Sequence, residues 1–196
     1  MTIYLASNNA HKVGEIMSSV ALLGLKLRFE DARSIGGMPE VDEDGLTLRD
    51  NALIKARALA ARAAGRWICA DDTGLFVDAL GGAPGVHTAR YAGMGAGSAA
   101  NNAKLLSALA GLPAAERGAE FRCCLCLFGP AGDASYFEGV FRGRIAESLC
   151  GSGGFGYDPL FIPEGYEVTV AELPSDLKNR ISHRALAVAA LGRALE

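Results

Sequence analysis

Two adjacent carboxylates, Asp71 and Asp72, are the clearest candidates for chemistry in this sequence. They follow the short apolar run Trp67 to Ala70 and precede Thr73 and Gly74. An apolar strand that stops at acidic residues delivers them to the carboxyl edge of a sheet, where open α/β folds hold their ligands. Such a pair indicates a divalent metal or a general base, although an isolated D-D-T-G sequence is more typical of a turn.

A second candidate is the polar segment Ser7-Asn8-Asn9-Ala10-His11-Lys12, which separates an apolar strand pattern from a helix pattern. Backbone N–H groups and the dipole at a helix N-terminus favour anions, so a phosphate is the natural ligand here. Capping of the helix by Ser7 or an Asn would explain the segment without any ligand. Lys12 favours the phosphate, because the dipole disfavours a cation in the first helical turn.

The acidic loop from Pro39 to Gly45 carries four carboxylates within five positions. A cluster of this kind is usually a solvated loop. A magnesium site is the sharper alternative, because Mg²⁺ takes one or two carboxylates together with substrate phosphates. Asp42 and Glu43 are the candidate ligands.

A helix is predicted from Leu48 to Ala64. Thr47 and Asp50 have the spacing of a capping box at its start. Asn51 and Lys55 are separated by four residues and therefore lie on one face. A polar stripe of this kind is usually the solvent face, but it would also direct Lys55 toward a ligand.

The Gly-rich segment from Cys150 to Gly165 contains two aromatic residues and one acid between its glycines, Phe155, Tyr157 and Asp158. Glycines permit close approach of the backbone to a ligand, and an aromatic ring could stack on a base. An ordinary Gly-rich turn is the plainer interpretation. Together with the cations and acids of the other segments, this one fits a nucleoside triphosphate with Mg²⁺.

Composition limits the other possibilities. The chain has 196 residues and a net charge of −3, which favours one domain or one domain in two lobes and argues against a general nucleic-acid-binding surface. No apolar run approaches the length of a membrane span, and no signal peptide is visible. The five cysteines are odd in number and four lie in or beside apolar runs, so we expect reduced, mostly buried cysteines in a cytoplasmic protein.

The predicted elements alternate between strands and helices at first, and a hairpin follows late in the chain. This order favours an α/β fold with a central mixed β-sheet flanked by helices over a purely parallel sheet. The predicted strands cover residues 2–6, 25–29, 67–70, 120–128, 134–145 and 168–173. The predicted helices cover residues 13–23, 48–64, 98–110 and 182–195, with a short helical turn at 175–178.

The motifs taken together resemble the inosine triphosphate pyrophosphatase family, and they extend in order over nearly the whole chain. They are S-N-N-A-H-K-V-G-E from Ser7, E-D-G-L-T-L-R-D-N-A-L-I-K-A from Glu43, A-D-D-T-G-L from Ala70, G-G-A-P-G-V-H-T-A-R-Y from Gly81, G-G-F-G-Y-D-P-L-F from Gly153 and K-N-R-I-S-H-R from Lys178.

The resemblance implies a single two-lobed domain over residues 1–196, with the active site in a cleft between the lobes, and a homodimer. The implied reaction is Mg²⁺-dependent hydrolysis of non-standard purine nucleoside triphosphates (ITP, dITP, XTP) to the monophosphate and pyrophosphate. In this reaction water attacks the α-phosphorus, and the hydrolysis removes these nucleotides from the nucleotide pool. Neither a nucleic acid nor a membrane is expected as a partner.

The resemblance also implies residue roles. Asp72 would act as the base toward water and, with Asp42, would hold Mg²⁺; whether Asp42 or Glu43 reaches the metal stays open. Lys55 would help to neutralise the phosphates. Substrate would be bound by Ser7, Asn8, Asn9, Ala10, His11, Lys12, Thr73, Phe155, Gly156, Tyr157, Asp158, Lys178, His183 and Arg184.

Within that set, Phe155 would stack on the purine. Arg184 or backbone N–H groups would select a 6-keto purine over adenine, because an amino group that faces a donor leaves both unpaired. His183 could instead simply cap the last helix.

Two rival functions stay open at this level. A Maf-like nucleotide pyrophosphatase would also release pyrophosphate, but it expects an S-x-S-P-R-R-type first loop, whereas this chain has S-N-N-A-H-K. A nucleotide sensor without turnover is the second rival, and the intact acids argue against it.

Overall fold

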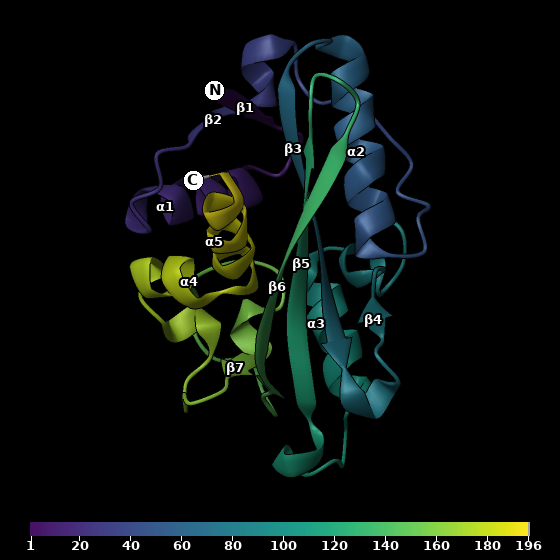
Figure 1. Cartoon of the computed structure of the whole chain (residues 1–196). Coiled ribbons are helices and arrows are strands. Elements are labelled where there is room, and N and C mark those ends of the chain that lie inside the picture. Colours follow the sequence, from purple (N-terminus) through teal and green to yellow (C-terminus); the bar gives the residue numbers. More distant parts are fainter. Residues whose placement is uncertain (196) are drawn as a thin grey trace. The chain divides into compact units, whose positions relative to one another are not determined.

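The computed structural model describes residues 1–195 and contains one mixed β-sheet with five α-helices (Figure 1). The strands are β1 (Thr2–Leu5), β2 (Arg28–Asp31), β3 (Trp67–Val77), β4 (Pro84–Gly85), β5 (Gly118–Phe128), β6 (Ala134–Ile145) and β7 (Phe161–Pro163). The helices are α1 (Ala10–Leu22), α2 (Leu48–Arg62), α3 (Ser98–Ala108), α4 (Ser175–Ile181) and α5 (His183–Leu195). None of these helices is long and apolar enough to cross a membrane.

The sheet has the strand order β2-β1-β3-β5-β6-β7, and β4 pairs with β3 off this path. Strand β1 runs parallel to both β2 and β3, whereas the β3–β4 and β6–β7 pairs are antiparallel. The predicted α/β fold with a mixed sheet flanked by helices is therefore confirmed.

The chain packs into two compact units, which are described separately. The first comprises residues 1–73, 123–139 and 179–195, and the second comprises residues 74–122 and 140–178. The long strands β3, β5 and β6 each contribute residues to both units.

In the first unit, helices α1 and α5 cover one side of the sheet and α2 covers the other (Figure 1). The apolar stripe of α1 (Val13, Ile16 and Val20) is buried, as its helical spacing predicts. It joins Cys69 of β3 and Val188 of α5 in one hydrophobic core. On the other side, the small residues of α2 allow that helix to lie close to the strands.

The second unit has its own core, in which Leu75 and Val77 of β3 pack with Leu105 of α3. Phe121 and Phe161 extend this core with ring centroids 4.7 Å apart. Each unit therefore buries its own apolar residues.

Strand β3 differs from the prediction. It does not stop at Ala70 but continues through Asp71 and Asp72 to Val77. The strand persists because strand-forming residues follow the acids and because Gly74 allows β4 to approach: a Cβ at Gly74 would lie only 2.6 Å from the carbonyl oxygen of Gly85. What ends beside the acids is the parallel neighbour β1, whose last paired residue faces Cys69.

Other strand predictions also need correction. Residues 168–173 were expected to form a strand, but Val170–Glu172 is a 3-10 turn, because Thr169 and Glu172 form a local capping box. Strand β7 was not predicted, because three residues inside a Gly- and Pro-rich segment carry almost no periodic signal. The second strand begins at Arg28 rather than Leu25.

Gly139 of β6 allows helix α5 to lie against the strand. A Cβ at this position would overlap the carbonyl oxygen of His183 and lie 2.6 Å from the backbone nitrogen of Ala187. Gly139→Ala should therefore lower the free energy of unfolding by about 1–3 kcal/mol, because the helix must shift. Urea denaturation measures the change.

Gly14→Ala is the matched control. Gly14 is an exposed residue inside α1, and its added Cβ would meet nothing within 4 Å. This substitution should be neutral or stabilise by up to about 1 kcal/mol. Equal effects of the two substitutions would contradict the close packing at Gly139.

Candidate active site

The two acids of β3 lie on opposite faces of the sheet, because successive side chains of a strand alternate. Both carboxylates are buried. Asp71 points to the side covered by α1 and α5, and Asp72 points to the side covered by α2. Each carboxylate therefore has its own set of partners, and all of these belong to the first unit.

Asp72 is held by two side chains of helix α2. The Lys55 ammonium lies 2.6 Å from Oδ1 of Asp72, and the Asn51 amide donates to Oδ2 at 3.4 Å. Lys55 also donates to Oε2 of Glu43 at 3.0 Å, so one ammonium bridges two acids. The oxygen of the Asn51 side chain accepts from the Gly45 backbone at 2.8 Å and ties the acidic loop to the helix.

Helix α2 is fixed at the start by the predicted capping box. Thr47 accepts from the backbone of Asp50, and the Asp50 carboxylate accepts from the backbone of Thr47. This cap fixes the residue at which helix α2 begins. With that start, Asn51 and Lys55 face the sheet rather than the solvent. The interpretation of the polar stripe as a solvent face is therefore wrong.

Burial raises the pKa of the Asp72 carboxyl above its ordinary value, and the ammonium groups of Lys55 and Lys12 offset only part of this effect. Burial acts in the same direction on Glu43, but the attraction of Lys55 outweighs it and lowers the pKa of Glu43. Burial would lower the pKa of Lys55, but the charges of Asp72, Asp71 and Glu43 raise it. Asp72 is thus the more basic acid of the bridged pair.

Asp71 has the opposite environment. Lys12 forms an ion pair with Oδ1 at 2.7 Å, and Oδ2 accepts from Arg184 at 3.0 Å and from the Thr73 hydroxyl at 2.9 Å. The thiol of Cys123 also points to Oδ2, at 3.7 Å. Burial would raise the pKa of Asp71, but Lys12, Arg184 and Lys55 together hold it well below its ordinary value.

Arg184 is fully buried and joins several parts of this network. Its guanidinium donates to Asp71, to Thr73 at 3.0 Å and to Glu15 of helix α1. The charges of Asp71 and Glu15 raise its pKa although burial acts against them. These contacts are all to protein groups; the contact of Arg184 with a purine stays a prediction.

The first polar loop is shaped by its own side chains. Asn9 caps helix α1 by accepting from the backbone of His11 at 3.0 Å and of Lys12 at 3.3 Å. Ser7 accepts from the backbone of Asn9 at 3.1 Å. The capping interpretation is therefore correct for Asn9, whereas Lys12 turns to Asp71. The remaining members of the loop, Asn8, Ala10 and His11, are exposed.

In the second unit, Asp158 organises the Gly-rich segment. Its carboxylate accepts from the backbone of Phe155 at 2.7 Å and forms an ion pair with Lys178. The Lys178 ammonium lies 4.8 Å from the centroid of the Phe155 ring. The carbonyl of Gly156 accepts from Asn102 of α3 at 3.1 Å. The structure therefore brings together three predicted substrate-binding residues: Phe155, Asp158 and Lys178.

Two further predicted substrate-binding residues, Tyr157 and His183, are also buried. The Tyr157 hydroxyl donates to the carbonyl of Thr88 at 2.9 Å, and burial raises the pKa of this hydroxyl. His183 is buried as the first residue of α5, but the capping interpretation does not apply to it, since Ser182 accepts from the backbone of Ala185. Tyr157 therefore contributes to the packing of its segment.

The two candidate metal ligands of the acidic loop have different environments. Glu43 is half-buried and contacts Lys55, whereas Asp42 is exposed. Among residues 1–195, no group of three or more His, Cys, Asp or Glu side chains gathers as a metal site. The arrangement at Asp72 offers two carboxylates, which suits a cation that also takes ligands from a substrate.

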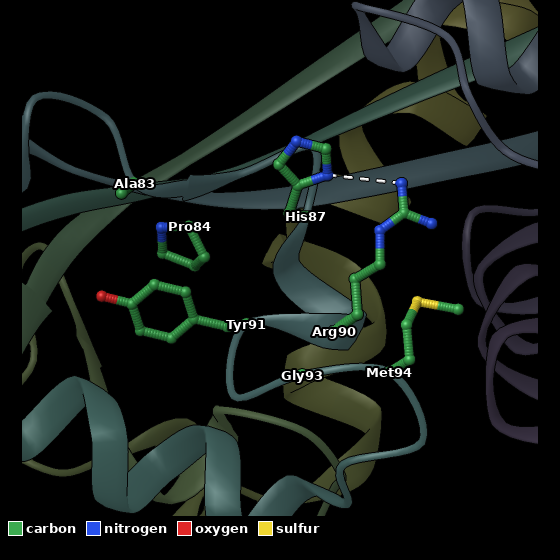
Figure 2. A pocket seen from close by; sticks show the side chains of 7 residues that line it. All are labelled: Ala83, Pro84, His87, Arg90, Tyr91, Gly93 and Met94. Atoms are coloured by element: carbon green, nitrogen blue, oxygen red, sulfur yellow. Dashed lines mark hydrogen bonds between the residues drawn. The ribbon is translucent and has the colours of Figure 1, made fainter.

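A pocket of about 390 Å³ lies within the second unit, on the loop that follows β4 (Figure 2). On its wall, Arg90 donates to the ring of His87 at 3.3 Å. None of the predicted site residues lines it. Its lining residues are Ala83, Pro84, His87, Arg90, Tyr91, Gly93 and Met94.

Some residues that contact the predicted site residues were missed or left without a role in the sequence analysis. Asp71 had no assigned partner, and Glu15 and Asn102 were not singled out. For Asp71 the signal was available, since neighbouring strand residues must face opposite sides. No local pattern reveals the ion pair between Glu15 and Arg184, because these residues are separated by 169 positions.

The fold and the site define the class: an α/β protein with a mixed sheet whose strand acids are buried and paired with lysines. Residues 3–194 match the model of the Ham1 family, and the chain belongs to this family. The resemblance predicted from the motifs is thus confirmed. A relative from Opitutus terrae called dITP/XTP pyrophosphatase is 48% identical over 97% of this chain and 97% of its own. A relative of the same name from Methylococcus capsulatus is 47% identical over 98% and 95%.

Solved structures agree. A HAM1 protein from Coxiella burnetii is 37% identical with a TM-score of 0.87, over 100% of this chain and 98% of its own. A nucleoside-triphosphatase, or dITP/XTP pyrophosphatase, from Mycobacterium abscessus is 40% identical with a TM-score of 0.77, over the full length of both chains.

The charge network on the Asp71 side leads to a stability prediction. Asp71→Asn should lower the free energy of unfolding near pH 7 by about 3–5 kcal/mol, because Lys12 and Arg184 lose a buried counter-charge. The folded pKa of Asp71 lies below its ordinary value of 3.8, so its contribution is complete above about pH 4 and is lost as the pH falls further. The difference between wild type and variant should therefore shrink in acid. Urea denaturation between about pH 7 and pH 3 measures it.

Asp31→Asn is the matched control, because Asp31 pairs with Arg33 at the surface at 2.7 Å. This change should cost less than about 1 kcal/mol. If Asp71→Asn costs no more than the control, the buried network does not stabilise the fold.

Proposed function

We propose that this protein hydrolyses non-standard purine nucleoside triphosphates, namely ITP, dITP and XTP, to the monophosphate and pyrophosphate. The observation that carries the proposal is the bridge from Lys55 to Asp72 and Glu43, which places a basic carboxylate beside a buried cation. The relatives called dITP/XTP pyrophosphatase support the substrate class.

The reaction needs a base, a positioned water and positive charge at the phosphates, and little else from the protein. Asp72 takes the proton of the attacking water, since its raised pKa makes it the stronger base of the bridged pair. Lys55 offsets the charge that grows on the phosphate oxygens. Lys12, held in place by Asp71, adds a second cation to the same unit.

The two bridged carboxylates also fit a divalent cation, because an ammonium already lies between them and Mg²⁺ accepts one or two protein carboxylates. Bound Mg²⁺ would polarise the phosphate oxygens and help to activate water. Glu43 is a better candidate than Asp42 for the second ligand, since Glu43 reaches Lys55 whereas Asp42 is exposed.

We propose that the purine stacks on the ring of Phe155. Asp158 holds the backbone of Phe155 in position, and the Lys178 ammonium lies over the Phe155 ring. The remaining predicted substrate contacts, the homodimer, the single two-lobed domain and the cytoplasmic location are part of this proposal through the family resemblance. A Maf-like pyrophosphatase is disfavoured, because relatives that are 47–48% identical to this chain carry the name dITP/XTP pyrophosphatase.

A substrate panel tests the proposal. The protein is incubated with Mg²⁺ and ITP, XTP, dITP, GTP or ATP, and the products are separated. ITP, dITP and XTP should yield the monophosphate and pyrophosphate, at rates about 10²-fold or more above ATP, because a site built for a 6-keto group leaves the adenine amino group unpaired.

Three outcomes would contradict it. Release of orthophosphate would place the attack at another phosphorus, and equal rates for ATP and ITP would remove the base selectivity. Binding of ITP without turnover would favour the nucleotide sensor.

A further inference from the structure

The Lys55 ammonium lies between the two carboxylates that are the candidate metal ligands. It is 2.6 Å from Asp72 and 3.0 Å from Glu43, and its side chain is only 9% exposed. A small cation could not bind both carboxylates while this ammonium stays in place, because the two positive groups would compete for the same oxygens. Lys55 therefore affects the binding of a metal ion as well as the binding of phosphate.

The surroundings keep the ammonium where it is. Capped helix α2 carries Lys55, and Asn51, one turn earlier on the same face, contacts Asp72 and the loop that carries Glu43. The lysine, the strand acid and the loop acid are thus held by connected elements of one unit. Displacing Lys55 would leave a buried ammonium without its partners, which is costly unless another anion replaces them.

We infer that Lys55 occupies the divalent-cation position of the free protein, so that metal binds there only together with a phosphate ligand that takes over the ammonium. This inference rests on the proposed function, because it assigns the cation to Asp72 and Glu43. The anion that releases Lys55 is the triphosphate of the substrate. Metal and nucleotide then enter as one unit, and the nucleotide-free protein holds neither.

Binding of Mn²⁺ to the nucleotide-free protein tests this inference without any measurement of turnover. Electron paramagnetic resonance distinguishes free from bound Mn²⁺. Lys55→Gln should bind Mn²⁺ about tenfold or more tightly than wild type, because the competing cation is gone. Lys55→Arg should stay like wild type, because it keeps a cation between the acids.

Lys12→Gln is the matched control for general electrostatics. Lys12 is also a cation close to this unit's acids, but its partner is Asp71 on the other face of the strand. It should raise Mn²⁺ affinity clearly less than Lys55→Gln does, because Lys12 acts on Asp72 and Glu43 only through its charge at a distance. In the Lys55→Gln background, the gain should vanish on Asp72→Asn or Glu43→Gln and should survive Asp42→Asn.

Equal gains from Lys55→Gln and Lys12→Gln would overturn the inference, because the effect would then be general charge. So would a tight Mn²⁺ site in nucleotide-free wild type that Asp72→Asn removes, and this result needs no folded lysine variant. Neither result affects the substrate panel, so failure of this inference and failure of the proposed function can be told apart.

Discussion

The alternation of side chains along β3 is the constraint on which the rest of the site depends. Two neighbouring carboxylates cannot share one face of a strand, so each is buried against a different layer of helices. A buried carboxylate must be paired or lose its charge. The first unit therefore carries cations on both sides of the sheet, Lys55 on the side of Asp72 and Lys12 with Arg184 on the side of Asp71.

The two faces are not equivalent, because the pKa values of their acids are shifted in opposite directions. The positive charges of Lys12, Arg184 and Lys55 outweigh the effect of burial on Asp71, so its pKa is held well below the ordinary range. The Lys55 ammonium contacts both Asp72 and Glu43. The nearby positive charges do not outweigh the effect of burial on Asp72, so the pKa of Asp72 stays raised. An acid with a raised pKa is a useful base, and one with a strongly lowered pKa is a fixed anchor. The same strand thus supplies the acid that we propose as the base, Asp72, and an acid that its cations hold in the ionised form, Asp71.

Much of this could be predicted from the sequence, because the signals were local. Helical spacing gave α1, α2 and α5, the Thr47–Asp50 cap gave the start of α2, and the order of motifs gave the family. What could not be predicted depends on distant partners. The continuation of β3 past Ala70 depends on the pairing with β4, and the burial of Lys55 depends on how α2 packs on the sheet. A turn and a strand can share the letters D-D-T-G; only the neighbouring elements decide between them.

The central claim is that Asp72 serves the reaction more than it serves the stability of the fold. The measurement that tests it most directly is the rate of ITP hydrolysis by Asp72→Asn together with its free energy of unfolding near neutral pH. Turnover should fall by about 10²-fold or more, while the loss in free energy of unfolding should stay below that of Asp71→Asn, because Lys55 keeps Glu43 as a counter-charge. A variant that keeps a near-normal rate, or that loses activity only because it unfolds, would contradict the account.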